Sequence, residues 1–384
     1  MQTPNKKPHI LFLFSDTGGG HRSATEAIME ALQLEFGDSF TMEMVDFFKS
    51  YAPLPFNKMP DWYPEMVKAP RLWSASFHAT DGRARARVIT STMWPVARQA
   101  ARHLIAAHPA DLIVTVHAFA NTFALKALKR PHGPFITVVT DMVTTHALWF
   151  DKRADLILVP TETARARAIR YHMDPDKVHV VGLPVEDRYC QPLGNRQALR
   201  DRLGWPVDKP MVLMVGGGEG MGPLAKVAAA VDESGLDLGL AIVAGRNVQL
   251  KSSLESRAWE NPAFIYGFTR DMPDLMRAAD FIVTKAGPGT ISEALNAQLP
   301  IILYSKLPGQ EDGNVTYVVE EGAGVWAPTP QLVVRALTRW ISRPHEKARV
   351  IETCRRLARP SAARLIAREI AQLLAKEQEA RPEE

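Results

Sequence analysis

The chain has 384 residues, of which 46% are hydrophobic and 23% charged, with 28 Pro, 24 Gly and 2 Cys. Since a domain usually holds about 100–200 residues, this length predicts two domains, and the composition excludes intrinsic disorder, collagen-like repeats and a disulfide framework. Cys190 and Cys354 form no C-x-x-C pair, so neither a zinc site nor an oxidising compartment is indicated. The formal net charge of +4 does not indicate a nucleic-acid partner.

The first half of the chain has the pattern of a parallel sheet covered by helices. A short apolar run at 10–14 ends in a glycine turn, Gly18-Gly19-Gly20-His21, and the apolar residues from Ala24 to Leu32 then recur at helical spacing. Strands that alternate with helices predict a doubly wound α/β domain. Further strands are predicted at 41–48, 111–116, 135–140 and 156–159.

A basic and aromatic segment lies between the second and third predicted strands. Residues 67–103 carry seven basic residues against the single acid Asp81, a local balance of +6 that exceeds the charge of the whole chain. Cations beside amphipathic aromatic rings suit an anionic membrane surface, whereas the alternative is an ordinary core helix with a solvated face. The candidate membrane residues are Trp62, Trp73, Phe77, Arg83, Arg85 and Arg87.

No stretch of the sequence predicts a membrane span. The most apolar long stretch, 112–128, is interrupted by His117, Asn121 and Lys126, and a span needs about 18 or more predominantly apolar residues with few or no charges. The opening apolar run reaches Asp16 too soon for a signal peptide. We therefore expect a cytoplasmic protein that associates peripherally with a membrane.

The second half repeats the α/β pattern. Strands are predicted at 211–215, 240–243, 281–284 and 301–304, and the first three run into glycine-containing turns. The sequence thus predicts two Rossmann-like, doubly wound parallel-sheet domains with a site in a cleft where the carboxyl ends of their strands face each other. The predicted parts are 1–185, 186–345 and a helical 346–384 that packs back on the first domain.

Glycine-rich turns between a strand and a helix indicate a phosphate ligand, because free N–H groups and the helix dipole attract oxygen anions. One such loop can be purely structural, but one in each domain favours a nucleotide. The first loop, Gly18-x-Gly20-x-x-Ser23, differs from the dinucleotide-binding fingerprint G-x-G-x-x-G/A only at its last position. Asp46 lies where that fingerprint expects a ribose-binding acid, so an NAD(P)-dependent dehydrogenase remains an alternative function.

His21, within the first glycine turn, is a candidate general base because imidazole titrates near neutrality. The alternative is a histidine that only hydrogen-bonds its own loop. The remaining histidines show no zinc-binding spacing, so no metal is expected.

Three groups of residues carry a resemblance to a known family. The second half contains Thr284-Lys285-Ala286-Gly287-Pro288-Gly289-Thr290 and Pro308-Gly309-Gln310-Glu311-Asp312-Gly313-Asn314, and the first half contains Gly18-Gly19-Gly20-His21-Arg22-Ser23-Ala24. These segments closely resemble the monogalactosyldiacylglycerol synthases, over about residues 10–326. Bacterial diacylglycerol glucosyltransferases and the peptidoglycan lipid-intermediate transferase share the same build.

The resemblance implies a GT-B fold and an inverting transferase that moves galactose from UDP-galactose to the sn-3 hydroxyl of diacylglycerol. It implies no bound metal and no cofactor, with UDP-hexose, diacylglycerol and anionic lipids as partners. UDP-glucose stays open as the donor, because a sequence does not reveal recognition of one epimeric hydroxyl. A non-catalytic membrane-binding protein is a further alternative.

Residue by residue, the resemblance implies a base, a residue that orients it and a donor site. His21 is the candidate base, oriented by Asp141 or Asp16. Gly217 and Gly218 would face the diphosphate, Phe268 the uracil and Glu293 the ribose. The other residues expected at the donor are Gly19, Gly20, Gly287, Gly289, Thr290, Gln310, Glu311 and Asn314.

Overall fold

The computed structural model describes residues 7–17, 19–66, 69–129, 132–218, 220 and 222–380. Gly18 of the first glycine turn and Lys68 of the basic segment lie outside the described residues. The chain divides into a first unit, residues 1–187, 308–310 and 361–384, and a second unit, residues 188–307 and 311–360.

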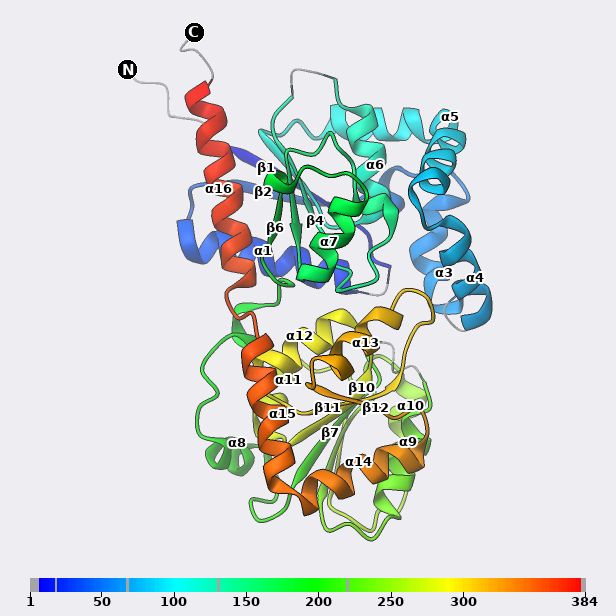
Figure 1. Cartoon of the computed structure of the whole chain (residues 1–384), viewed down its shortest axis with the longest axis vertical. Coiled ribbons are helices and arrows are strands. Elements are labelled where there is room, and N and C mark those ends of the chain that lie inside the picture. The colour runs from blue at the N-terminus through cyan, green and yellow to red at the C-terminus, as the bar shows by residue number, and fades with distance from the viewer. Residues whose placement is uncertain are drawn as a thin grey trace. The chain divides into compact units, whose positions relative to one another are not determined.

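The first unit is built on a six-stranded sheet in which the described strand pairs are all parallel (Figure 1). The strand order is β2-β1-β3-β4-β5-β6, so the direction of winding reverses between β1 and β3. Ligands of open α/β sheets bind at such a reversal, outside the carboxyl ends of the strands. The strands are β1 His9–Phe14, β2 Thr41–Asp46, β3 Leu112–Thr115, β4 Phe135–Val138, β5 Leu156–Val159 and β6 Val178–Val180.

Successive side chains along the strands of this sheet pack alternately into two hydrophobic clusters, one on each face. Ile10 and Phe12 pack with α1 and α16, whereas Leu11 and Leu13 pack with α2, α5, α6 and α7. Burial of both faces explains why the strands read as continuous apolar runs rather than as alternating ones. The helices are α1 Gly20–Phe36, α2 Phe47–Tyr51, α3 Met59–Met66, α4 Pro70–Thr80, α5 Arg83–Ala107, α6 Ala118–Ala127, α7 Glu162–Arg170 and α16 Ala362–Ala380, with 3-10 turns η1 Phe56–Lys58, η2 Ala147–Trp149 and η3 Pro175–Lys177, while η4 Asp187–Tyr189 spans the division between the units.

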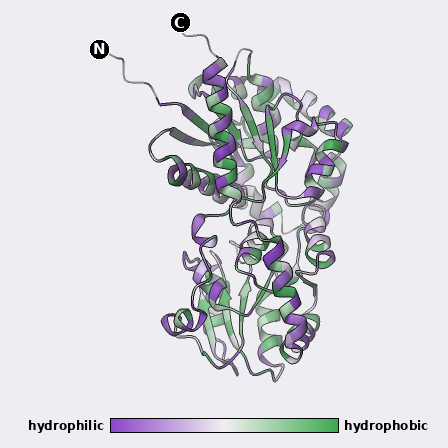
Figure 2. Cartoon of the chain, turned by 60° about the vertical axis from the view of Figure 1, so that its left-hand side comes forward, coloured by the Kyte–Doolittle hydropathy of each residue, from purple (hydrophilic) through white to green (hydrophobic). Residues whose placement is uncertain are grey.

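The second unit repeats this plan with a six-stranded parallel sheet of order β12-β11-β10-β7-β8-β9. Its winding reverses between β7 and β10, which are hydrogen-bonded neighbours. Figure 2 shows the strands of both sheets coloured mainly as hydrophobic. The strands are β7 Met211–Val215, β8 Gly239–Val243, β9 Ala263–Tyr266, β10 Phe281–Lys285, β11 Ile301–Ser305 and β12 Gly324–Trp326.

One face of the second sheet is closed by α9 and α14. Val212 and Met214 of β7 pack in a single cluster with Leu224 and Val227 of α9 and with Leu337 of α14. The helices of this unit are α8 Arg196–Leu203, α9 Leu224–Asp232, α10 Val248–Glu255, α11 Met272–Ala278, α12 Pro288–Asn296, α13 Asp312–Glu320, α14 Pro330–Ser342 and α15 Pro344–Leu357.

The two C-terminal helices belong to different units. In α15, the buried Cys354 donates to the carbonyl of Leu299 in the second unit (3.3 Å). In α16, Ile366 and Ile370 are fully buried against the first sheet, and Arg364 binds Glu35 of α1 (2.9 Å). The part predicted as 346–384 is therefore divided between the units, and their first boundary lies at 187/188 rather than at 185/186.

The predicted strand at 41–48 ends earlier than expected. Asp46 closes β2 and caps α2, because its carboxylate accepts the backbone N–H of Lys49 (2.9 Å), and Phe47 and Phe48 then begin the helix. An aspartate at the N-cap supplies an acceptor for the free N–H groups of the first turn. The hydrophobic pattern alone did not show this change from strand to helix, since Phe47 and Phe48 are both buried and their hydrophobicity fits a strand as well as a helix.

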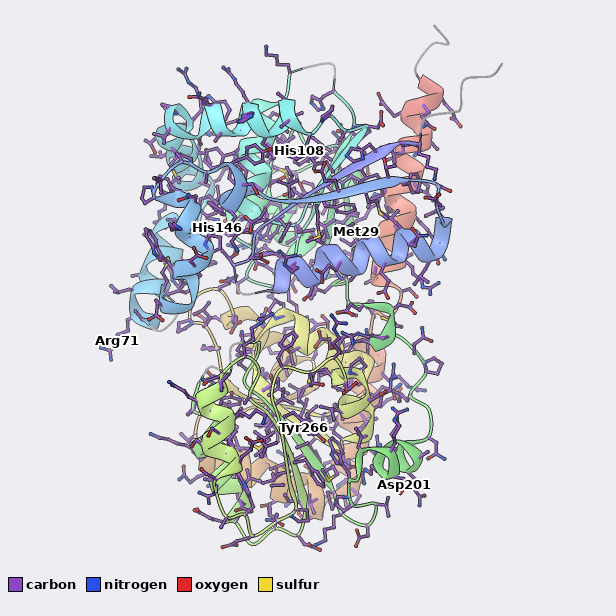
Figure 3. All side chains as sticks on the ribbon, turned by 180° about the vertical axis from the view of Figure 1, so that it is seen from behind. Met29, Arg71, His108, His146, Asp201 and Tyr266 are labelled. Carbon is purple, nitrogen blue, oxygen red and sulfur yellow. The ribbon has the colours of Figure 1, made fainter. Side chains whose placement is uncertain are left out.

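The helices α3, α4 and α5 form the part of the first unit that carries the basic and aromatic segment. Trp62 is 47% exposed and Leu72 73% exposed, and Arg71 extends outward from α4 (Figure 3). Among the described residues, the helices are all too short or too polar to cross a membrane.

Candidate functional site

Two loops meet the reversal in the first sheet and carry the histidines of the candidate site. His21 lies in the first turn of α1, after β1, and His117 lies two residues beyond the end of β3 as the N-cap residue of α6. The two imidazole rings contact each other edge-on, with their centroids 4.7 Å apart. The fold therefore brings together two histidines that are 96 positions apart in the chain.

His21 is partly buried beside the end of β4. Its Nδ1 lies 2.9 Å from the hydroxyl of Thr140. Burial lowers the pKa of His21 below 6.5, while the charge of Asp141 and a backbone hydrogen bond with Val116 act in the opposite direction. A lowered pKa keeps the imidazole neutral near pH 7, which is the form that accepts a proton.

Asp141 is buried next to this histidine and is held by two donors. The indole Nε1 of Trp149 donates to its Oδ2 (2.7 Å), and the amide of Gln310, in the short segment that groups with the first unit, donates to its Oδ1 (3.1 Å). The Trp149 ring lies 6.2 Å from the His21 ring. These hydrogen bonds fix the position of the Asp141 carboxylate near His21.

The carboxylate of Asp16, the other acid considered for orienting His21, has a different partner. Arg22 grips it with two hydrogen bonds of 2.6 Å, and the guanidinium also lies over the ring of Phe14 at 4.7 Å. Asp46, the candidate ribose-binding acid, accepts the backbone N–H of Asp16 (2.9 Å) in addition to capping α2. Both oxygens of Asp46 are therefore used within the fold.

His117 is buried, and its surroundings are mainly aromatic. Its Nε2 lies 3.4 Å from the hydroxyl of Thr17, and its Nδ1 is buried without a hydrogen-bond partner in the described part of the chain. Burial, and secondarily the charge of a protonated His21, lower its pKa well below 6.5. His117 is thus a neutral ring that packs against the candidate base.

The glycines of the first turn leave the N-terminus of α1 open. Gly19 caps the helix in a left-handed conformation, with φ of +77°, and a Cβ on Gly19 or Gly20 would meet no atom within 4 Å. The first turn holds no acidic residue and the cap makes no side-chain hydrogen bond. Its backbone N–H groups and positive dipole end are therefore available for an anion.

In the second unit, two glycine loops meet at the reversal between β7 and β10. Gly217, after β7, has φ of +73°, and Gly287, after β10, caps α12 without a side-chain hydrogen bond. Lys285 lies against both loops, because a Cβ on Gly217 would come 2.9 Å from its Cε and a Cβ on Gly287 would come 3.2 Å from its Nζ. A larger residue at either glycine would displace this lysine.

Lys285 and Glu311 form a largely buried ion pair. The ammonium lies 2.9 Å from Oε1 of Glu311, and Oε2 of the same carboxylate accepts the backbone N–H of Leu307 (2.6 Å). Glu311 is only 5% exposed. Both of its oxygens have partners within the unit, so the carboxylate fixes the position of the ammonium beside the glycine loops.

Asn314 and Gly289 shape the start of α12. The amide of Asn314 donates to the carbonyl of Ala286 (2.9 Å), while its own Oδ1 is buried without a partner among the described residues. A Cβ on Gly289 would meet no atom within 4 Å, so space is open there. Thr290 lies in the first turn of α12 and Glu293 one turn later, both partly buried.

Phe268 and Arg246 form an exposed pair at the edge of the glycine loop. The guanidinium of Arg246 lies 4.5 Å from the centroid of the Phe268 ring, which is 61% exposed. The backbone N–H of Arg246 donates to the carbonyl of Gly218 (2.8 Å). The pair thus presents a flat cation and a flat ring next to the candidate phosphate loop.

The candidate membrane residues differ in their exposure. Trp62 is exposed, whereas Trp73 and Phe77 are partly buried, and the Phe77 ring contacts His146 at 5.3 Å. Arg83 and Arg87 are exposed at the start of α5. Arg85, although exposed, donates to the carbonyls of His78 (2.7 Å) and Asp81 (3.3 Å) and so closes the end of α4.

Three of these residues were not assigned a role from the sequence. His117 and Trp149 become visible only when distant segments meet, although His117 follows a predicted strand at the sheet reversal, where a site is expected. Lys285 stands inside the family-like motif, at the carboxyl end of a predicted strand. Within the described ranges, His, Cys, Asp and Glu side chains form no group of three or more that is able to hold a metal ion.

Solved structures share the arrangement of both units. A putative UDP-N-acetylglucosamine 2-epimerase from Listeria monocytogenes matches with a TM-score of 0.65 at 14% identity, covering 99% of each chain. MurG from Acinetobacter baumannii matches with a TM-score of 0.60 at 15% identity, covering 95% of this chain and 99% of that one. CalG4, the calicheamicin glycosyltransferase, also has a TM-score of 0.60 at 15% identity, over 97% and 99%. These likenesses show that the predicted GT-B fold is correct.

Sequence relatives are much closer. The family model described as monogalactosyldiacylglycerol (MGDG) synthase matches residues 21–185, and the glycosyltransferase family 28 C-terminal domain matches residues 211–366. A probable monogalactosyldiacylglycerol synthase 2, chloroplastic, from Oryza sativa is 37% identical over 95% of this chain and 80% of its own. Monogalactosyldiacylglycerol synthase 3, chloroplastic, from Arabidopsis thaliana is 36% identical over 96% and 82%. Because this identity extends over both units, the chain belongs to the monogalactosyldiacylglycerol synthase family.

Proposed function

We propose that this protein is a glycosyltransferase that moves galactose from UDP-galactose to the sn-3 hydroxyl of 1,2-diacylglycerol. The observation that carries the proposal is the 36–37% identity to monogalactosyldiacylglycerol synthases over nearly the whole chain. The first unit adds a partly buried, neutral histidine, and the second adds two glycine loops packed around a fixed lysine. The family assignment replaces the dehydrogenase alternative, and Asp46 has both oxygens engaged in the fold.

The first unit supplies the base. The hydroxyl oxygen of diacylglycerol attacks the anomeric carbon, and its proton passes to the neutral imidazole of His21. Asp141 stabilises the imidazolium that forms, because its charge favours the protonated ring. Trp149 and Gln310 fix that carboxylate and so act as positioning residues.

The second unit supplies the donor site and stabilises the leaving group. As the bond between the anomeric carbon and the phosphate oxygen breaks, UDP takes the electron pair, and negative charge grows on the diphosphate. The N-terminus of α12, the backbone around Gly217 and Gly218 and the ammonium of Lys285 are suited to that charge. These groups would do the work that a metal ion does in other transferases, so we propose that no metal is required.

The remaining donor contacts follow from the same unit. Phe268 and Arg246 offer a stacking surface for the uracil, and Glu293, one turn into α12, is proposed to bind the ribose hydroxyls. Gly19 and Gly20 keep their proposed role as a second anion-binding turn. A single displacement of this kind inverts the anomeric carbon and yields a β-galactoside from the α-linked donor.

Replacing Lys285 with methionine is expected to weaken UDP binding about 10- to 100-fold, since a hydrogen bond to a charged group contributes about 1.5–3 kcal/mol. The change also leaves the Glu311 carboxylate buried without its cation, which is expected to destabilise the protein by about 3–5 kcal/mol. Calorimetric titration with UDP and thermal unfolding measure the two effects.

The double variant Lys285→Met/Glu311→Gln separates the two effects. Removing the unpaired charge is expected to restore part of the lost stability, while UDP affinity stays low because the ammonium is still missing. Wild-type affinity for UDP in either variant would show that Lys285 serves the fold alone.

The dependence of kcat/KM on pH is expected to report the pKa of His21. Burial lowers that pKa below 6.5, so activity should be level near pH 7 and fall only below pH 6.5, as the base becomes protonated. Asp141→Asn removes an influence that raises the pKa, so the acid limb should move to lower pH as the rate decreases. Assays between about pH 5 and 8 test this, and an acid limb that moves to higher pH in Asp141→Asn would contradict it.

The proposed function is tested by incubating the purified protein and diacylglycerol vesicles with UDP-galactose and with UDP-glucose separately. Chromatography of the lipids is expected to show a monoglycosyl product with UDP-galactose. Product from UDP-glucose alone would establish the alternative donor, and no glycolipid from either donor would refute a transferase. We further propose that the protein binds peripherally to anionic membranes through α3–α5.

A further inference from the structure

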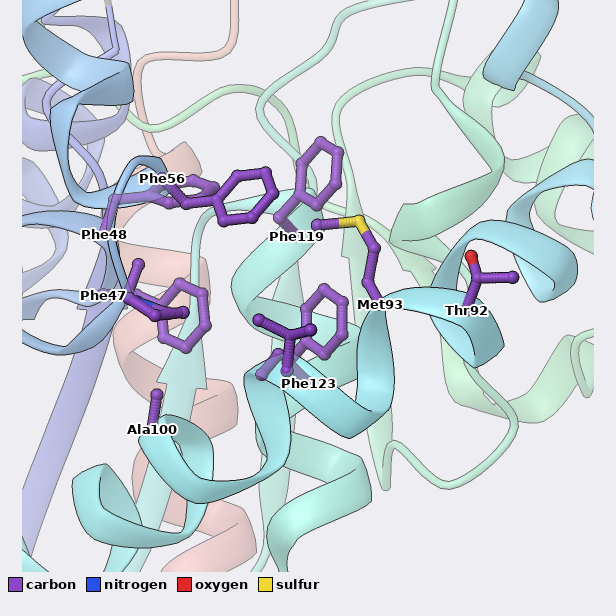
Figure 4. A pocket seen from close by; sticks show the side chains of 12 residues that line it. Phe47, Phe48, Phe56, Thr92, Met93, Ala100, Phe119 and Phe123 are labelled. Carbon is purple, nitrogen blue, oxygen red and sulfur yellow. The ribbon is translucent and has the colours of Figure 1, made fainter.

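The first unit contains an apolar pocket that the proposed chemistry does not use. It lies between α2, η1, α5 and α6 and has about 620 Å³ of empty space, part of it open to solvent (Figure 4). The larger side chains that line it are Phe47, Phe48, Phe56, Met93, Phe119 and Phe123. Among the described residues that line it, Thr92 has the only hydroxyl group and none is charged.

The wall of the pocket is connected to the candidate base by a series of ring contacts. Phe48, in the pocket wall, meets the ring of His117 edge-on, with centroids 5.6 Å apart. His117 in turn contacts His21, with centroids 4.7 Å apart. Phe119, also in the wall, lies 6.3 Å from His117. A molecule in the pocket therefore lies two rings away from the group that accepts the proton.

The pocket reaches the surface along α5. Val96, which lines it, is 56% exposed, and the neighbouring Pro95 lies inside the helix. Proline cannot donate the hydrogen bond that the carbonyl of Ser91 would otherwise accept, which loosens a helix locally. Leu54, next to the lining residue Pro53, is 75% exposed. Apolar side chains thus continue from the pocket wall to the outside.

We infer that this pocket holds one acyl chain of the diacylglycerol acceptor while the sn-3 hydroxyl is at His21. The inference rests on the proposed function. An acyl chain matches the lining, because it is apolar and unbranched and needs no hydrogen-bond partner. The ester that joins it to glycerol lies within a few bonds of the reacting hydroxyl, which fits a pocket whose wall residue Phe48 contacts His117, the ring that contacts His21.

The pocket contributes differently in water and in a membrane. From water, each methylene that enters it is expected to raise affinity about fourfold, which corresponds to about 0.8 kcal/mol. A chain that leaves a bilayer gains little, since lipid tails are as apolar as the pocket. In the membrane the pocket therefore fixes the position of the acceptor, and its energetic contribution is measurable only with acceptors dissolved as monomers.

The test compares dibutyryl-, dihexanoyl- and dioctanoylglycerol, each below its micellar concentration, with UDP-galactose. For the wild type, kcat/KM is expected to rise about tenfold or more between successive acceptors until the pocket is full. Ala100→Phe fills the pocket, since Ala100 lines it, and should reduce activity on dioctanoylglycerol more than tenfold while activity on dibutyrylglycerol changes little. Ala106→Phe, an exposed position on the same helix, is the matched control and should retain the wild-type profile.

The outcomes separate the inference from the proposed function. Wild-type protein that transfers galactose to none of these acceptors, and to no diacylglycerol in vesicles, contradicts the function itself. Transfer with an unchanged chain-length profile in Ala100→Phe overturns the pocket assignment.

A measurement on the unaltered protein covers the case in which Ala100→Phe does not fold. Dioctanoylglycerol with a diazirine at the end of one chain is irradiated in the presence of the wild type, and the labelled peptides are mapped by mass spectrometry. Label is expected on Phe56 and Met93. Label found only on segments that do not line the pocket would overturn the inference.

Discussion

Replacing His21 with alanine is expected to lower kcat by about 10²–10⁴-fold, the range that a positioned general base contributes. Burial lowers the pKa of this ring and so keeps it neutral, Asp141 lies beside it, and its Nδ1 is 2.9 Å from the hydroxyl of Thr140. UDP affinity should stay near the wild-type value, since the proposed contacts of Phe268, Glu293 and Lys285 belong to the other unit and the backbone N–H groups at Gly19 and Gly20 are kept in the variant. Initial rates with a soluble acceptor and titration with UDP measure both quantities.

Two further variants make this result specific. Thr140→Val removes the hydroxyl 2.9 Å from Nδ1 and is expected to give a smaller loss of about tenfold, because the base remains but is held less firmly. His179→Ala removes a histidine that pairs with Glu369 away from the site and should leave the rate unchanged. If His21→Ala keeps more than a tenth of wild-type kcat, the base must be another group.

Reversing two charges at the start of α5 is expected to weaken binding to anionic vesicles at least 30-fold. Arg83 and Arg87 are exposed there, and each basic residue near an anionic surface contributes about 1 kcal/mol, so Arg83→Glu/Arg87→Glu removes about 2 kcal/mol and adds repulsion. Arg85 is left in place because it closes α4 through two carbonyls. Co-sedimentation with vesicles of phosphatidylglycerol at physiological salt measures the effect.

The matched control is Arg335→Glu/Arg349→Glu, which makes the same change in net charge at exposed positions of the second unit. It should bind vesicles almost as the wild type does. Equal losses in both double variants would show that net charge, rather than the α3–α5 surface, drives membrane binding. Unchanged binding of Arg83→Glu/Arg87→Glu would refute the proposed surface.

The proposed membrane surface on α3–α5 also carries exposed apolar side chains. Trp62, Leu72 and Val88 are 47%, 73% and 61% exposed, so α3, α4 and α5 each present a large apolar group close to basic ones. Trp73 and Phe77 are less available than the sequence suggested, because they are partly buried against the first unit. The spacing of the aromatic residues in the sequence did not distinguish the exposed Trp62 from the partly buried Trp73 and Phe77.

The strands could be predicted from the sequence with small errors, since buried parallel strands are short apolar runs. The run at 10–14 lies within β1 His9–Phe14, and the runs at 156–159 and 211–215 coincide with β5 and β7. The strands β6 Val178–Val180, β9 Ala263–Tyr266 and β12 Gly324–Trp326 were not predicted, because short strands whose residues are mostly only partly buried give no continuous apolar run. The division of the two C-terminal helices between units was likewise not predictable, since it depends on which core each helix joins.

The candidate site was predictable only where chemistry lies in adjacent residues. The glycine turns and His21 stand out locally, and the family resemblance supplied Asp141. The edge-on contact between His21 and His117, and the indole donor to Asp141, join segments that only the sheet topology brings together. In the second unit, Glu311 and Asn314 were expected at the donor, and their contacts with Lys285 and with the start of α12 become visible only in the fold.

The most direct measurement is the anomeric configuration of the lipid product formed from UDP-galactose and diacylglycerol. A direct displacement that uses His21 as base and releases UDP predicts a β-galactosyl diacylglycerol, which the proton coupling at the anomeric carbon identifies in an NMR spectrum. An α-galactosyl product would contradict the single displacement, and the absence of any galactolipid would contradict the transferase.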